Sequence, residues 1–186
     1  MNEQKLHSFW QWFQVNASSL YLTREGHDLA FRALSEKLKE LHPRLSVELS
    51  QEVDGERELI LSADAEDSIF PIITKICNYA PEIAGFKIIP LRKKLSSSLG
   101  IWMDGHYLET NQISFVGVQS QKKWNLCFFV TEFKGSQEAC QNAVSILLEH
   151  TLGERNVAHK IKSWKINFQL SESRVAKKYS ELNLLF

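Results

Sequence analysis

Cysteine and histidine could bind a transition metal or act as nucleophiles, and the chain has three cysteines and six histidines. Cys77, Cys127 and Cys140 are separated by 50 and 13 residues, and neither C-x-x-C nor H-E-x-x-H occurs. Cys77 and Cys140 lie in apolar helical stripes, and Cys127 lies in the most apolar predicted strand. Buried thiols are poor nucleophiles, and no serine occupies a G-x-S-x-G turn. We therefore predict no metal site and no catalytic residue.

Glycines and paired carboxylates form no catalytic pattern either. None of the eight glycines falls in G-x-G-x-x-G or G-x-x-x-x-G-K, so no known nucleotide-binding motif is present and no cofactor is predicted. Gly100 and Gly105 flank Ile-Trp-Met-Asp in a predicted loop. We place the acidic residues of 56–58 on a solvated strand face. Those of 64–67 begin a helix, where the helix dipole favours negative charge.

Lysine and aromatic residues interleave in the second half of the chain, at 122–124 and 160–165. Basic strands with aromatic residues between the lysines can bind single-stranded nucleic acid by charge and base stacking. Along the second segment, however, Lys165 is out of phase with Trp164, Ile166 and Phe168. This alternation places the aromatic side chains toward a core and this lysine toward solvent. This alternation makes nucleic-acid binding the less favoured function, and we keep it as an alternative.

Hydrophobic periodicity divides the first half of the chain into helices and strands. The predicted elements are helices over 4–21, 25–41 and 68–80 and strands over 45–49, 57–62 and 86–91. His42-Pro43 ends the second helix, Asp54-Gly55 forms the turn between the first two strands, and Pro71 belongs to the first turn of the third helix. Trp12 lies about 100° away from the apolar stripe of the first helix.

The second half shows the same order of patterns. The predicted elements are strands over 112–118, 124–133 and 161–168 and a helix over 136–153. Ser136 is the expected helix cap and Gly153 the expected end. Residues 126–130 are apolar on both faces, which predicts a central strand covered on both sides. The apolar tail, 182–186, is predicted to be a short strand or an end that docks onto the body.

A basic and serine-rich joint at 92–98 separates the two halves. We predict an α+β fold in which two similar hairpin–helix–strand halves form mixed or antiparallel sheets with helices packed on one side. An N-terminal helical hairpin precedes them. The predicted domains are 1–95, which contains that helical hairpin and the first half, and 96–186, which contains the second. The two could also form one compact domain.

Composition excludes a uniformly basic or membrane-spanning protein. The 186 residues include 22 Lys and Arg against 22 Asp and Glu. This balance hides an asymmetry, since residues 1–85 have 8 basic against 14 acidic residues and residues 86–186 have 14 against 8. Opposite charges of this kind favour docking of the halves or self-association. No apolar run approaches a membrane span of about 18 residues. Three widely spaced cysteines and the absence of a signal-peptide pattern predict a cytoplasmic protein.

Several short motifs resemble those of an uncharacterised family of bacterial α+β proteins. That family begins with an F-W-x-W-F helix, has an I-S-A strand end and an A-P-E helix end, and carries a late L-G-E followed by an apolar and basic strand. The similar segments here are Phe9–Phe13, Leu41–Leu45, Glu58–Ala63, Ala80–Glu82 and Leu152–Glu154. The resemblance implies a bacterial, cytoplasmic protein of unknown function, and it supplies no catalytic residues.

We expect a non-enzymatic module that binds a partner protein or regulates one, or that associates with itself. Aromatic residues outside the predicted core, Trp12, Trp102 and Tyr107, are the candidate contacts. An alternative is an enzyme or small-molecule binder with a site in the cleft between the halves, where Asp104, His106 and Tyr107 would supply polar groups. The remaining alternative is weak nucleic-acid binding through the basic second half.

Overall fold

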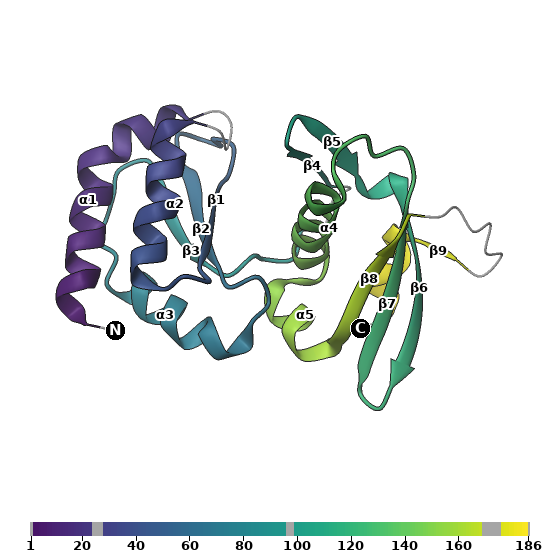
Figure 1. Ribbon diagram of the computed structural model, residues 1–186. Coiled ribbons are helices and arrows are strands. Elements are labelled where there is room, and N and C mark those ends of the chain that lie inside the picture. Colours follow the sequence, from purple (N-terminus) through teal and green to yellow (C-terminus); the bar gives the residue numbers. More distant parts are fainter. Residues whose placement is uncertain (1, 24–27, 96–98, 169–175, 186) are drawn as a thin grey trace. The chain divides into compact units, whose positions relative to one another are not determined.

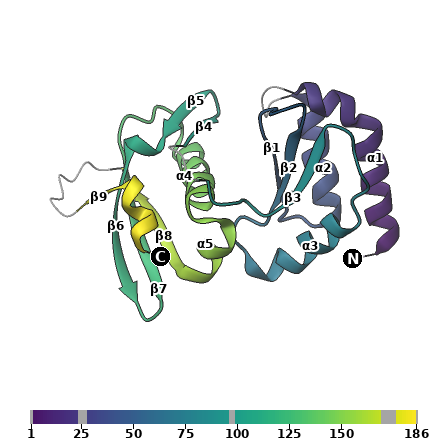
Figure 2. The ribbon, with the colours of Figure 1, turned by 180° about the vertical axis from the view of Figure 1, so that it is seen from behind.

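The structure, a computed structural model, describes residues 2–23, 28–95, 99–168 and 176–185. The chain divides into two compact units, Met1–Arg92 and Lys93–Phe186. Each unit combines helices with a sheet, so the predicted α+β class is confirmed (Figures 1 and 2). Of the predicted joint at 92–98, residues 96–98 lie outside the described residues.

The first unit begins with two helices, as the apolar spacing predicts. α1 (Glu3–Leu22) is capped by the side chain of Asn2, and α2 (Leu29–Leu41) by the side chain of Asp28, each accepting a hydrogen bond from a backbone N–H of the first turn. α2 ends where predicted, because a residue before proline avoids the α conformation and His42 has a φ of −160°. The predicted start of the second helix lies partly outside the described residues.

Three strands form the sheet of the first unit: β1 (Ser46–Leu49), β2 (Arg57–Ser62) and β3 (Phe86–Pro90). Their order is β1-β2-β3, with β2 antiparallel to β1 and parallel to β3. A short 3₁₀ turn (Asp67–Ile69) and α3 (Phe70–Asn78) connect β2 to β3, with Pro71 in the first turn as predicted. α1 packs onto the other elements through Trp10, whose indole N–H donates to the Ile76 carbonyl at 3.0 Å.

Within the second unit, the segment from residue 113 to residue 167 follows the order strand, strand, helices and strand. The unit's main sheet contains β6 (Ile113–Ser120), β7 (Lys123–Val130), β8 (Ile161–Asn167) and β9 (Lys177–Lys178). The order is β8-β7-β6-β9, with β7 antiparallel to β6 and parallel to β8. Between β7 and β8 the chain forms α4 (Gln137–Leu152) and α5 (Glu154–Lys160). Ser136 caps α4 and Gly153 ends it with a φ of 83°, both as predicted.

Three segments of the second unit differ from the prediction. The loop predicted between Gly100 and Gly105 belongs to a hairpin, β4 (Gly100–Met103) and β5 (His106–Glu109). α5 was not predicted, because seven residues are too few for a clear apolar stripe. The tail forms a 3₁₀ helix (Tyr179–Leu185) rather than a strand, and it docks as the other alternative predicts, with Leu182 fully buried. Phe186 lies outside the described residues.

Among the described residues, helices cover the main sheet of the second unit on one face. Leu126 and Phe128 of β7 are buried on the side of α4 and of the tail, and the ring of Tyr179 packs 5.9 Å from that of Phe128. Cys127 and Phe129 point the other way and are half-buried, with none of the described helices on that side (Figures 1 and 2). The prediction that β7 is covered on both sides is therefore wrong, whereas helices on one side are present.

Candidate functional site

Two aromatic side chains stand exposed on the β4–β5 hairpin. Trp102 and Tyr107 face each other across the two strands, with their ring centroids 5.3 Å apart and their planes at 41°. They are 69% and 43% exposed. A Cβ at Gly100 would lie 2.1 Å from the Tyr107 hydroxyl, so the absence of a side chain at Gly100 lets the Tyr107 ring lie over the backbone. We call Trp102, Tyr107 and Gly100 the aromatic patch.

The hairpin is short, but its turn and its inner face hold it in place. Asp104 and Gly105 both have positive φ, 50° and 76°, as the two central residues of a type I′ turn require. On the face opposite to the aromatic patch, Leu108 is fully buried. The ring of His106 meets that of Phe133 edge to face at 5.9 Å. The aromatic patch therefore rests on an anchored support.

Carboxylates flank the aromatic patch. Glu109 lies on the same face as Trp102 and Tyr107, since it pairs with Gly100 across the strands. Its carboxylate accepts a hydrogen bond from the Asn111 side chain at 2.7 Å, which orients it. Asp104 is exposed in the turn. The site thus combines two π faces with negative charge.

The structure separates the predicted polar group of Asp104, His106 and Tyr107. His106 and Tyr107 are neighbours in β5, so their side chains point to opposite faces of the hairpin. The imidazole joins the packing around Phe133, and the phenol joins the aromatic patch. The three side chains therefore do not converge on one point.

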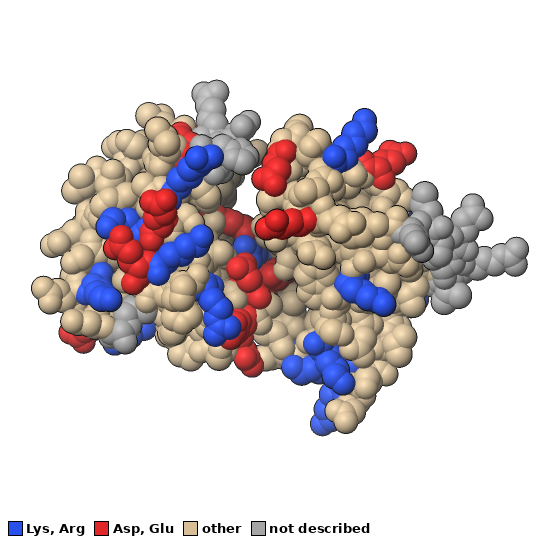
Figure 3. Space-filling model, viewed as in Figure 1, with Lys and Arg blue, Asp and Glu red and all other residues tan. Residues whose placement is uncertain are grey.

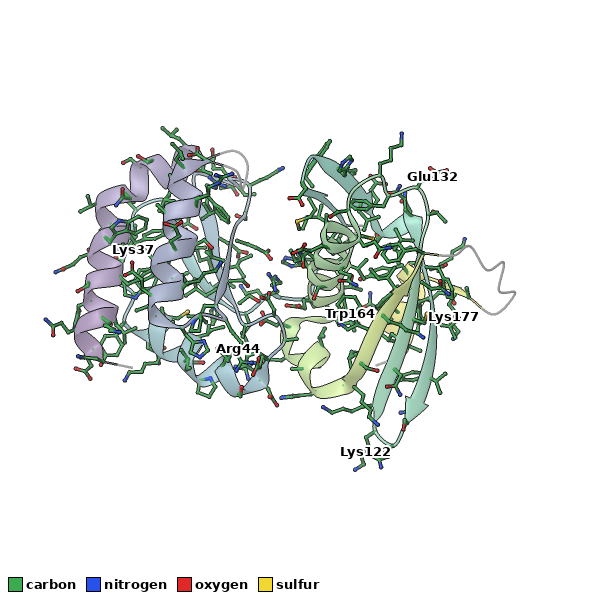
Figure 4. The ribbon with its side chains drawn as sticks, in the orientation of Figure 1. Lys37, Arg44, Lys122, Glu132, Trp164 and Lys177 are labelled. Carbon is green, nitrogen blue, oxygen red and sulfur yellow. The ribbon has the colours of Figure 1, made fainter. Side chains whose placement is uncertain are left out.

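Trp12 belongs to the first unit, where it lines a groove of about 770 Å³ between α1 and α2. The groove is lined by Asn2, Gln4, Lys5, Ser8, Phe9, Trp12, Lys37, Glu40 and Leu41. Lys37 lies between the two helices and forms an ion pair with Glu40 at 2.8 Å (Figure 4). Trp12 is half-buried. Trp12 and the aromatic patch are thus candidate contacts in separate units.

Cys77 and Cys140 occupy environments that suppress thiol reactivity. Burial raises the pKa of the Cys77 thiol to about 12 and that of Cys140 to about 11, because an apolar surrounding disfavours the thiolate. Within the described parts of the chain, no group of three or more histidine, cysteine, aspartate or glutamate side chains could hold a metal ion.

The basic and aromatic residues near the C-terminus do not form a stacking surface. Trp164 lies on the α4 side of β8, where its ring packs 6.1 Å from that of Phe128 (Figure 4). Lys162 and Lys165 are exposed. Lys122 stands at the tip of the β6–β7 hairpin. Lys165 follows Trp164 directly in β8, so the two side chains lie on opposite faces of the strand, as the alternation in the sequence predicts.

Two buried arginines of the first unit have structural roles that the sequence did not reveal. Arg57 donates hydrogen bonds to three carbonyls at the end of α1, those of Leu20 at 3.1 Å, Tyr21 at 2.9 Å and Thr23 at 2.6 Å. Arg92 was predicted in the basic joint, but its guanidinium is buried against Glu48 and donates to Asp64 at 2.8 Å. The partners lie 28 to 44 residues away from these arginines, so sequence spacing carries no signal for them.

No protein-family model matches the chain, and neither does any curated protein or solved structure. Among the described residues, no helix combines the length and the apolar character needed to cross a membrane. The resemblance of the short motifs to an uncharacterised bacterial family therefore stays a prediction. The strongest functional signal in the chain's own geometry is the exposed aromatic patch with its flanking carboxylates.

Proposed function

We propose that the protein is a non-enzymatic interaction module that binds a partner protein through the aromatic patch of β4–β5. The observation that carries this proposal is the paired exposure of Trp102 and Tyr107 on an anchored hairpin. Tryptophan and tyrosine are over-represented among the residues that dominate binding energy in protein interfaces. Leaving two such rings in water has a free-energy cost that a partner's surface would remove.

The chemistry around the aromatic patch favours a basic partner segment. An arginine or lysine placed over an indole or phenol ring gains a cation–π interaction, of about 0.5–2 kcal/mol according to how far it is desolvated. The carboxylates of Glu109 and Asp104 would pair with the same cation or with its neighbour. We therefore expect the partner to present an exposed segment containing arginine or lysine.

The two alternatives from the sequence remain predictions with less support. A polar site of Asp104, His106 and Tyr107 requires the three side chains to converge, and His106 points away from Tyr107. Nucleic-acid binding by interleaved lysine and tryptophan requires an exposed ring, and Trp164 packs against Phe128. Binding of a partner protein through the aromatic patch needs neither the convergence of these three side chains nor an exposed Trp164 ring.

Selection of random peptides displayed on phage tests this proposal without knowledge of the native partner. The full chain serves as bait, and the double variant Trp102→Ala/Tyr107→Ala serves as counter-bait. We expect enriched peptides to contain arginine or lysine and to bind the double variant at least about 30-fold more weakly, the effect of losing about 2 kcal/mol.

A matched control replaces an exposed apolar residue elsewhere in the same unit. Val118 is 62% exposed, so Val118→Ala removes apolar surface without changing the β4–β5 hairpin. Peptides that bind wild type, Val118→Ala and the double variant equally would refute the proposed site. Enrichment of acidic peptides would refute the proposed partner chemistry.

A further inference from the structure

The outer face of α1 carries a second stripe that the core does not use. The residues of this stripe follow one another at steps of four, three, four and three, and they are Ser8, Trp12, Val15, Ser19 and Leu22. At 100° per residue they fall within a strip about 80° wide. The core stripe of the same helix lies on the other side, through residues such as Leu6 and Phe13. We call this second set the outer stripe.

The outer stripe faces solvent and contains large apolar side chains. Val15 is 85% exposed and Leu22 is 76% exposed. Trp12, half-buried, stands where the outer stripe meets the groove beside α2. An exposed helix face normally carries charged residues, and large apolar groups grouped there mark an interaction surface.

Charged residues are missing from most of α1. Between Leu6 and Leu22 the helix has no aspartate, glutamate, lysine or arginine. On the face drawn in Figure 3, charged side chains gather over α2 and the lower end of α1, and the upper length of α1 is free of them. Depletion of charge together with exposed aromatic and aliphatic groups is typical of the centre of an interface.

The order of side-chain sizes along the outer stripe indicates which partner fits it. The stripe reads small, large, medium, small, large from Ser8 to Leu22. When a second α1 runs antiparallel to the first with Val15 opposite Val15, Ser8 faces Leu22, and Trp12 faces Ser18, the neighbour of Ser19. Each large side chain then meets a small one. Because the outer stripe contains no charged residue, the contact buries no charge from it.

We propose that the outer stripe is the interface of a homodimer, in which α1 packs antiparallel against α1 of a second copy about a two-fold axis at Val15. Alternating steps of three and four residues suit two helices that cross at about 20°. The same patch on both copies makes the contact isologous and closed. A single helix pair is smaller than a standard interface, so we expect the dimer to dissociate on dilution.

Light scattering on the purified full chain, over a range of concentrations, tests the dimer. We expect a mass of about 43 kDa at high concentration, twice the 21.5 kDa of one chain, falling toward 21.5 kDa on dilution. Val15→Glu should remain monomeric throughout, because it places two carboxylates together at the axis. The control Gln14→Glu adds the same charge on an exposed position that points about 100° away, and it should dimerise as wild type does.

A mixing experiment tests the register. Val15→Glu and Val15→Lys should each be monomeric alone and should form a mixed dimer together, since the two-fold axis brings position 15 of one copy to position 15 of the other. Circular dichroism checks that both variants are folded, which we expect because Val15 is exposed. A wild type that is monomeric at every concentration, or a dimer that survives Val15→Glu, would overturn the proposal. Failure of the two variants to pair would overturn the antiparallel register at Val15.

Discussion

Arg57 holds the C-terminal end of α1, and its replacement should destabilise the first unit strongly. Arg57 as a whole residue is 7% exposed. Its guanidinium donates to the carbonyls of Leu20, Tyr21 and Thr23, and its Nε–H donates to the Ser50 carbonyl at 2.7 Å. The last carbonyls of a helix lack partners within its regular hydrogen-bond ladder, and this single side chain donates to three of them. The Leu20 carbonyl also accepts from the backbone N–H of Thr23 at 3.3 Å.

The magnitude follows from two opposing contributions. Hydrogen bonds that involve a charged group contribute about 1.5–3 kcal/mol each. Arg57 has four acceptors, but three of them share the two N–H groups of Nη1, so the contributions are not additive. Burial opposes them, and it lowers the pKa of Arg57 because the cation loses hydration. For Arg57→Met we expect a loss of about 3–5 kcal/mol, as for other buried networks from which one charged partner is removed. Arg57→Lys keeps the charge but lacks the planar fork, so it should lose less.

Urea unfolding followed by circular dichroism, together with hydrogen exchange of peptides from α1, measures this effect. Arg44→Met is the control, because Arg44 pairs with Glu66 at the surface and the pair should contribute less than about 1 kcal/mol. We expect faster exchange at the C-terminal end of α1 in Arg57→Met and not in Arg44→Met. Equal, small losses in both variants would refute the role assigned to Arg57.

Two further predictions concern the patch and the thiols. In Gly100→Ala the new Cβ would lie 2.1 Å from the Tyr107 hydroxyl and would displace the Tyr107 ring. Binding of a selected basic peptide should therefore weaken by roughly tenfold, while the circular dichroism spectrum stays unchanged. Unchanged peptide binding would contradict the geometry of the aromatic patch. Because burial raises the pKa of Cys77 and Cys140, alkylation by iodoacetamide at pH 8, mapped by mass spectrometry, should be at least about 100-fold slower in the native protein than after unfolding. The free energy of unfolding that these two thiols contribute should be intact below their ordinary pKa of 9.0 and should fall as the pH rises toward 11. Alkylation of the native protein at the rate of the unfolded protein would contradict the burial of the two thiols.

The elements that the sequence predicts well are those with local signals. α1 and α4 have long apolar stripes, and α4 also has a capping serine and a terminal glycine. The β6–β7 hairpin follows from alternation around a polar turn. In each case the signal lies within the residues that form the element, so no knowledge of the tertiary structure is needed.

The features that the sequence did not predict depend on distant contacts or on very short segments. β4 and β5 have four residues each, and the Asp104-Gly105 turn between them was interpreted as part of a loop. The bonds of Arg57 to α1 and of Arg92 to Asp64 join residues far apart in the chain. Trp102 and Tyr107 were predicted as candidate contacts, but their pairing on one face required the strand register.

The central claim, that the aromatic patch binds a basic segment, is tested most directly by nuclear magnetic resonance. A selected arginine-containing peptide is titrated into the full ¹⁵N-labelled chain, and the indole N–H signals of the five tryptophans are followed. The account predicts that the Trp102 indole and the amides of β4 and β5 shift in a saturable way, and that the indole of the buried Trp10 does not. An unmoved Trp102 signal during saturable binding would contradict it.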